Sequence, residues 1–206
     1  MQAPIFSFTR LRGADPNLGV EMASTGEVAC FGEDQNEAFM QALLSTTFQL
    51  PTKNHSILIS IAEDSKRFEF SESLLSLASS GKYKLYGTPG TAAYYKGHYN
   101  VDMVVVQKST NEEDDGQGTA LHAIKKGDID LVINVSDGSV RKDEITSGYL
   151  IRRTTVDFGT SLITNVKCAV ELVNCLERGF DSESAFTPRH ISEYYKIPSV
   201  GWTVKK

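Results

Sequence analysis

The sequence predicts an α/β protein built on a five-stranded parallel sheet with helices on both faces. From residue 56 to residue 164, short apolar runs of strand length alternate with segments whose apolar residues recur at helical spacing. The run at 57–61 is almost continuously apolar, which is typical of a strand buried on both faces of a parallel sheet. Strands separated by helices in this way favour parallel pairing.

Each element follows from the same patterns. The predicted strands cover residues 57–61, 83–86, 101–106, 129–135 and 161–164. The predicted helices cover residues 68–80, 92–96, 119–126, 148–158 and 166–178. Gly81, Gly127 and Gly179 follow three of these helices, where a glycine can take the left-handed conformation that ends a helix.

The ends of the chain differ from this central part. Asp34 is a candidate cap for a helix over 35–44, but residues 1–50 are too few to bury a core of their own. We interpret residues 1–50 as the end of a larger preceding domain and residues 51–180 as a complete α/β domain. Residues 181–206 show no sustained period and form a tail or a linker.

Composition excludes several classes of protein. The net charge of −5 over 206 residues does not favour binding to nucleic acid or to an anionic membrane. The three cysteines, Cys30, Cys168 and Cys175, are odd in number and lack metal-site spacing, which argues against a disulfide framework or a zinc site. Their usage fits a reducing compartment, and no apolar run approaches the length of a membrane span. We expect a cytoplasmic protein without a metal ion.

The turn at 87–91 is the strongest candidate for a binding site. It lies between the predicted strand 83–86 and the predicted helix 92–96, and it contains Gly87, Thr88, Gly90 and Thr91. Such a turn presents free backbone N–H groups and the positive end of a helix dipole, which suit a phosphate. The threonines can add hydroxyl donors. A turn of this composition can also be only a connection.

Basic and polar side chains follow the other predicted strands, and the carboxyl ends of parallel strands meet at one edge of the sheet. The side chains are Lys66 after the first strand, Lys108 after the third, Asn134, Ser136, Arg141 and Lys142 after the fourth, and Lys167 after the fifth. Single lysines and arginines usually solvate a surface, but their agreement with the phosphate turn favours an anion site. Arg152 and Arg153 stand at the start of a predicted helix, where the dipole disfavours positive charge, so we expect one of them to face an anion or a carboxylate.

Groups for covalent or acid–base chemistry are harder to find. The sequence has no Walker lysine, no GxGxxG, and no apparent Ser-His-Asp or Cys-His arrangement. The carboxylates at 112–115 are best interpreted as a solvated charge run rather than a general base. The predicted site therefore has groups for binding and no clear catalytic group.

Several motifs resemble one family over residues 1–180. They are Arg10-Leu11-Arg12-Gly13-Ala14-Asp15, Glu21-Met22-Ala23-Ser24-Thr25-Gly26-Glu27, Tyr149-Leu150-Ile151-Arg152-Arg153-Thr154 and Ile163-Thr164-Asn165-Val166-Lys167-Cys168. They resemble the carboxyl-terminal part of the large chain of carbamoyl-phosphate synthetase, most of all its pyrimidine-specific eukaryotic type. Residues 1–50 resemble the end of its second ATP-grasp domain. Residues 53–180 resemble its regulatory domain, which has the three-layer, Rossmann-type fold of methylglyoxal synthase.

The resemblance implies an effector-binding domain. The effector would be UMP, UDP or UTP as inhibitor, or phosphoribosyl pyrophosphate as activator. Its phosphate and sugar would be held by Lys66, Thr88, Gly90, Thr91, Lys108, Asn134, Ser136, Arg153 and Lys167. The parent enzyme makes carbamoyl phosphate from bicarbonate, glutamine and ATP with magnesium. Synthetase and glutaminase domains of that enzyme would be the partners.

Two other functions stay open. A phosphate-eliminating lyase of the methylglyoxal synthase type shares the fold, but Gln117 stands where that enzyme needs an aspartate, and Ala62 and Glu144 stand where it needs histidines. A module that only binds a partner domain is the second alternative. We expect no enzymatic activity from this chain alone, because the nucleotide lid and magnesium carboxylates of the ATP-grasp domain lie outside it.

Overall fold

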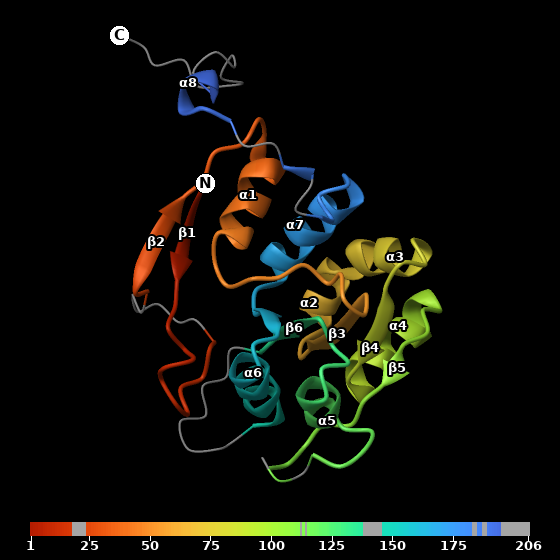
Figure 1. Ribbon diagram of the computed structural model, residues 1–206. Helices are drawn as coiled ribbons and strands as arrows, with labels where there is room; N and C mark the ends of the chain where they lie inside the picture. Colours follow the sequence, from red (N-terminus) through yellow and green to blue (C-terminus); the bar gives the residue numbers. More distant parts are fainter. Residues whose placement is uncertain are drawn as a thin grey trace.

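Five parallel strands form the centre of the molecule. The computed structural model describes residues 1–17, 24–111, 113, 115–137, 146–182, 185–186 and 189–194. Within them the sheet has the order β5-β4-β3-β6-β7, and all four pairings are parallel (Figure 1). The strands are β3 (Ser56–Ile61), β4 (Lys84–Gly87), β5 (Val104–Val105), β6 (Leu131–Val135) and β7 (Ser161–Ile163). The predicted fold class is confirmed.

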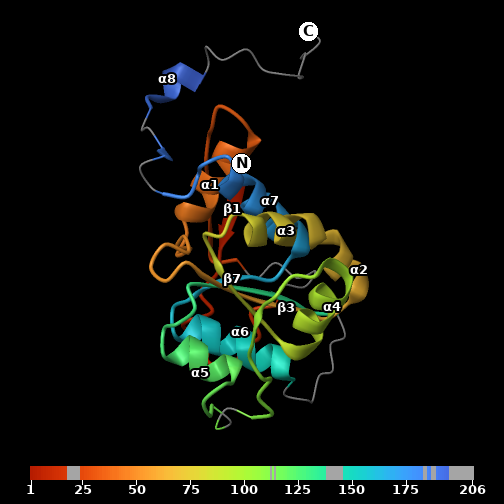
Figure 2. The same ribbon diagram turned by 90° about the vertical axis from the view of Figure 1, so that its right-hand side faces the viewer.

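Helices cover both faces of this sheet and make three layers (Figure 2). They are α2 (Asp64–Glu69), α3 (Ser71–Ser79), α4 (Pro89–Tyr99), α5 (Ala120–Lys125), α6 (Ser147–Asp157) and α7 (Val166–Glu177). Ile57, Ile59 and Ile61 of β3 pack in one cluster with α3, α4 and α7, whereas Leu58 packs in the other with α5 and α6. Successive residues of a strand point to opposite faces of the sheet, and helices cover both faces here. Every residue of β3 therefore packs against a helix layer, which explains its nearly unbroken apolar run.

The predicted helix at 68–80 is two helices in the structure. Phe70 ends α2 and begins α3, and its side chain is fully buried. The α2 helix has no buried residue, and Phe68 is 70% exposed, so the sequence lacked the apolar stripe that reveals a helix. The start of this pair at Asp64 was therefore missed.

The helix after the phosphate turn is longer than predicted, and the neighbouring strand is shorter. The α4 helix spans eleven residues with Pro89 in its first turn, where proline costs no hydrogen bond. It ends at Tyr99, and the next residue, Asn100, is its C-cap with the left-handed φ of 53° that asparagine tolerates. Only Val104 and Val105 pair as β5, within the predicted strand 101–106.

The first fifty residues pack against the central domain. Strands β1 (Gln2–Ile5) and β2 (Gly26–Ala29) form an antiparallel pair, and α1 (Gln35–Leu44) follows them (Figure 1). Asp34 caps α1 by accepting a hydrogen bond from the Glu37 N–H at 3.0 Å, as the sequence predicts. The fully buried Met40 of α1 joins the core cluster that contains α7. The α1 helix thus shares the core of the following domain.

The predicted tail is described only in part. A short helix, α8 (Ile191–Tyr194), lies beyond α7, and the Arg189 guanidinium pairs with Glu33. Residues 195–206 lie outside the described residues. In the portion of the chain that the structure covers, every helix is too short or too polar to cross a bilayer.

Candidate functional site

The amino terminus of α4 lies at the carboxyl edge of the sheet, as predicted. Thr88 is its N-cap residue with an extended backbone, but the Thr88 side chain makes no capping hydrogen bond. In contrast, the side chains of Thr119, Thr146 and Asn165 cap α5, α6 and α7. The first N–H groups of α4 therefore lack the side-chain acceptor that those helices have, and an anion can take that place.

The hydroxyl groups of Thr88 and Thr91 hold this turn to the neighbouring strand. Both residues are 1% exposed. Thr91 Oγ1 accepts a hydrogen bond from the Ile61 N–H at 3.0 Å, and Thr88 Oγ1 lies 3.2 Å from Ser60 Oγ. The threonines thus fix the turn on β3, and the donors that remain open to a ligand are the backbone N–H groups.

Two basic residues of α2, Lys66 and Arg67, reach the carboxyl edge of the sheet. Lys66 Nζ donates to the Ser136 carbonyl oxygen at 2.7 Å and lies 3.4 Å from Glu63 Oε1, so it joins the loops after β3 and β6. Arg67 Nε donates to the Ile61 carbonyl oxygen at 2.8 Å, and its Nη2 lies 3.4 Å from the position that a Cβ on Gly90 would occupy. Arg67 therefore stands at the open end of α4, and Lys66 stands at the end of β6 on the same edge of the sheet.

Arg67 was not among the predicted site residues. Arg67 directly follows Lys66 in the sequence, after the same predicted strand, and this position could have marked it as a second candidate for the anion site. Consecutive residues on a helix point about 100° apart. The side chain that faces the turn therefore depends on where α2 begins, and the sequence did not show that beginning.

The polar residues after β6 are held by other parts of the chain. Asn134 is 2% exposed, and its Oδ1 accepts a hydrogen bond from Arg152 Nη1 at 2.9 Å. Ser136 Oγ accepts from Asn17 Nδ2 at 3.2 Å. The expectation that one of the two adjacent arginines faces a carboxylate is confirmed, because Arg152 pairs with Asp15 and Arg153 pairs with Asp157. Sequence reasoning missed Asn17, because its contact joins segments more than a hundred residues apart.

The two adjacent arginines lie in the middle of α6, and their predicted place at the start of a helix was wrong. The Arg153 guanidinium pairs with Asp157, and it also donates to the carbonyl oxygens of Phe8, Leu11 and Ala14. The hydrogen bond to Asp157 raises the pKa of Arg153. In this structure Arg153 thus binds protein groups and does not join the cluster around α4.

The remaining predicted residues spread along the same edge. Lys108 and Lys167 are exposed, after β5 and in the first turn of α7. Among the described residues, no hydrogen bond or ion pair joins either lysine to Lys66 or to the turn. Ala62 and Gln117 are exposed in the described structure. Arg141, Lys142 and Glu144, with positions 112 and 114 of the acidic run, lie outside the described residues.

The arrangement suits binding of a small anion. Donors converge from α2 and α4, and the described residues hold no group of three His, Cys, Asp or Glu side chains that could bind a metal ion. Asp115, the described carboxylate at the end of the acidic run, pairs with Lys125, which lowers the pKa of Asp115. That pairing agrees with a solvated charge rather than a general base.

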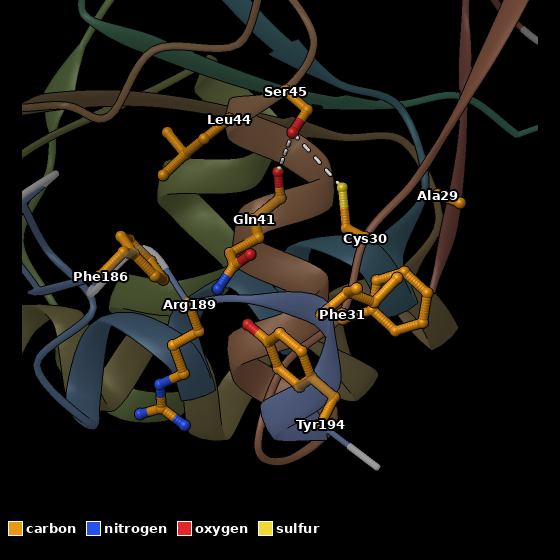
Figure 3. Close-up of a pocket in the computed structure, with 10 residues that line it drawn as sticks. Ala29, Cys30, Phe31, Gln41, Leu44, Ser45, Phe186, Arg189 and Tyr194 are labelled. Carbon is orange, nitrogen blue, oxygen red and sulfur yellow. Dashed lines mark hydrogen bonds between the residues drawn. The ribbon is translucent and has the colours of Figure 1, made fainter.

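A separate cavity of about 550 Å³ lies between α1 and α8 (Figure 3). It is lined by Ala29, Cys30, Phe31, Gln41, Leu44, Ser45, Phe186, Arg189, Ile191 and Tyr194. None of these residues follows a strand of the parallel sheet, so the cavity is distinct from the candidate site.

The chain is similar to known proteins over most of its length. Residues 69–164 match the MGS-like domain family. "Multifunctional protein pyr1-3" of Dictyostelium discoideum is 43% identical over 85% of this chain, and "Multifunctional protein URA2" of Saccharomyces cerevisiae is 41% identical over 86%. "Carbamoyl-phosphate synthase [ammonia], mitochondrial" of Aquarana catesbeiana is 42% identical over 80%.

The matched share of those relatives is small. The chain spans 8% of the first two proteins and 11% of the third. A crystal structure of a methylglyoxal synthase from Elizabethkingia anophelis aligns with a TM-score of 0.44 at 20% identity, over 58% of this chain and 78% of that chain. The family match includes the α4 turn, Asn134 and Ser136. The chain therefore carries an MGS-like domain homologous to the carboxyl-terminal region of the carbamoyl-phosphate synthetase large chain.

Proposed function

We propose that this chain is the effector-binding region of a glutamine-dependent carbamoyl-phosphate synthetase in pyrimidine biosynthesis. The ligand is a uridine nucleotide, UMP, UDP or UTP, with phosphoribosyl pyrophosphate as a second candidate. The observation that carries this proposal is the uncapped amino terminus of α4 beside Arg67, with Lys66 at the end of β6 on the same edge of the sheet. The similarity to multifunctional proteins and to carbamoyl-phosphate synthases supports it.

The geometry supports one binding mode. A phosphate accepts hydrogen bonds from the first N–H groups of α4, and Lys66 turns from the Ser136 carbonyl oxygen toward it. Asn134 and Ser136, at the end of β6, contact the sugar or the base. Lys108 and Lys167 neutralise further phosphates from their exposed positions. Backbone donors with one lysine correspond to micromolar affinity, on the order of −8 kcal/mol.

The binding experiment is titration calorimetry of the chain with UMP, UTP, phosphoribosyl pyrophosphate and unphosphorylated uridine. We expect heat from phosphorylated ligands and little from uridine. Lys66→Ala should weaken UMP binding about tenfold, because it removes one charge-assisted hydrogen bond. The matched control is Lys96→Ala, which removes an exposed lysine of α4 that pairs with Asp102. A folded chain that gives no heat with any phosphorylated ligand would refute the proposal.

The lyase alternative has its own assay. A methylglyoxal synthase would turn over dihydroxyacetone phosphate, whereas we expect this chain to bind phosphate without eliminating it. Ala62 and Gln117 support that expectation, because neither side chain can act as the acid or base that the reaction needs. Production of methylglyoxal above the uncatalysed rate would favour the lyase.

We also expect no synthesis of carbamoyl phosphate by this chain alone. Its partners would be the synthetase and glutaminase domains of a larger cytoplasmic enzyme that uses ATP and magnesium. An interaction module without a ligand site would instead bind those domains and show no nucleotide binding, so the same calorimetry separates the two functions.

A further inference from the structure

We propose that Arg152 is a positioning residue that couples the candidate ligand site to the N-terminal arm, defined here as residues 8–17. In this view a ligand that reaches Asn134 and Ser136 binds more tightly when the arm is docked on α6, and it strengthens that docking in return. The inference rests on the proposed function and extends it to specific residues.

Arg152 connects the arm to the site by direct hydrogen bonds. Its Nε donates to Asp15 Oδ1 at 2.7 Å, and its Nη2 bonds the other carboxylate oxygen of Asp15. On the opposite side its Nη1 donates to Asn134 Oδ1 at 2.9 Å. Arg152 is 4% exposed, so water has little access to break this chain of contacts. A bidentate pair of this kind also fixes geometry.

The contact with Arg152 decides which atom of Asn134 is offered to a ligand. A guanidinium can only donate, so the Asn134 atom that it contacts must be the carbonyl oxygen. The amide nitrogen then points elsewhere, and it makes no hydrogen bond within the described part of the chain. Asn134 is therefore set to donate, and the matching ligand group is an acceptor, such as a hydroxyl or a carbonyl oxygen.

A second contact, which does not involve Arg152, also connects the arm to the end of β6. Asn17 Nδ2 donates to Ser136 Oγ at 3.2 Å, so the arm holds both polar side chains at the end of β6. Gly148 leaves room for the arrangement, since a Cβ there would lie 3.1 Å from Arg152 Nη1. Release of the arm would free both Asn134 and Ser136 to rotate.

Thermodynamic linkage makes the effect reciprocal. If arm docking raises ligand affinity by some factor, the ligand favours docking by the same factor. Inorganic phosphate provides an internal comparison, because it would occupy the α4 turn without reaching Asn134. The coupling should therefore appear with UMP and be absent with phosphate.

The experiment compares the chain with Asp15→Ala, using UMP and inorganic phosphate as probes. We expect the affinity for UMP to fall roughly tenfold, within the range typical of coupled sites, while the affinity for phosphate stays the same. Asp15→Glu, which keeps the charge, should recover part of the loss. Asp102→Ala removes a comparable ion pair, with Lys96 on α4, and should change neither affinity.

Two further measurements report directly on the docking of the arm and on the side-chain amide of Asn134. UMP should slow hydrogen exchange of the arm amides in the unmodified chain, and it should do so less in Asp15→Ala. The side-chain amide signal of Asn134 in proton–nitrogen NMR should shift in Asp15→Ala without any ligand.

The outcomes separate this inference from the proposed function. UMP binding that is equal in the two chains, or a loss shared equally by phosphate, would overturn the coupling and leave the effector site standing. If no nucleotide binds the unmodified chain, the proposed function and the coupling to ligand both fall.

Discussion

At the scale of single residues, the buried hydroxyl of Thr91 has a structural task. It accepts from the Ile61 N–H and lies 3.3 Å from the Ile61 carbonyl oxygen, so it completes hydrogen bonds at the end of β3. Buried backbone groups without a partner are costly. The threonine therefore holds the turn in place on β3.

Thr91→Val should reduce the free energy of unfolding by about 1–3 kcal/mol, because it keeps the shape and leaves the Ile61 N–H without its acceptor. Urea denaturation measures the change. Thr47→Val, at an exposed position, should alter stability by less than about 0.5 kcal/mol. An equally stable Thr91→Val chain would show that the hydroxyl has no structural role.

The same scale shows how far the site could be read from the sequence. Lys66, Thr88, Thr91, Asn134 and Ser136 could be selected as candidate site residues because they follow predicted strands, and a parallel sheet brings the ends of its strands together. The direction of each side chain could not be predicted. Lys66 and Arg67 are sequence neighbours with different contacts, and Arg153 binds carbonyl groups that only the folded arm brings to it.

At the scale of elements, α1 shows a helix whose start was predictable. Asp34 accepts from the Glu37 N–H, and its carboxylate also pairs with Arg178 after α7. The hydrogen bond from the Glu37 N–H, aided by Arg178, lowers the pKa of Asp34. By contrast, α2 was missed because its exposed side chains carry no pattern.

Asp34→Ala should lower the free energy of unfolding by about 1 kcal/mol at neutral pH, as is typical of a lost N-cap. A lowered carboxyl pKa gives stability that is present above the unfolded-state value and is lost as the pH falls through the folded-state value. The difference between the two chains should therefore shrink below about pH 4. Urea unfolding at both pH values tests this, and Asp34→Asn should keep most of the cap. A loss that is the same at both pH values would contradict the assigned role of the charge.

At the scale of the whole molecule, the arm is attached to the domain mainly through α6. Tyr149 Oη donates to the Gly13 carbonyl oxygen at 3.0 Å, next to the contacts of Arg152 and Arg153. The sequence predicted the five strands and every helix of the sheet except α2, because those elements have a local pattern. It could not predict this attachment, since the contacts join residues more than 130 positions apart.

Arg153→Leu should loosen the arm, because one guanidinium makes four hydrogen bonds to three carbonyl oxygens of the arm. Trypsin should then cleave after the exposed Arg10 and Arg12 roughly tenfold faster, as expected for the loss of a charge-assisted hydrogen bond. Lys126→Leu, which removes an exposed pair with Asp128, is the control. An unchanged rate of tryptic cleavage would show that Arg153 does not hold the arm on the domain.

The two adjacent arginines of α6 also differ in what they recognise. Arg153 contacts main-chain oxygens, which every residue type possesses, so it accepts any segment that turns in the same way. Arg152 contacts the carboxylate of Asp15, which occurs at one position in the arm. If the arm slid by one residue along α6, the first set of contacts could form again and the second could not. Asp15 therefore determines the register in which the arm lies on the domain.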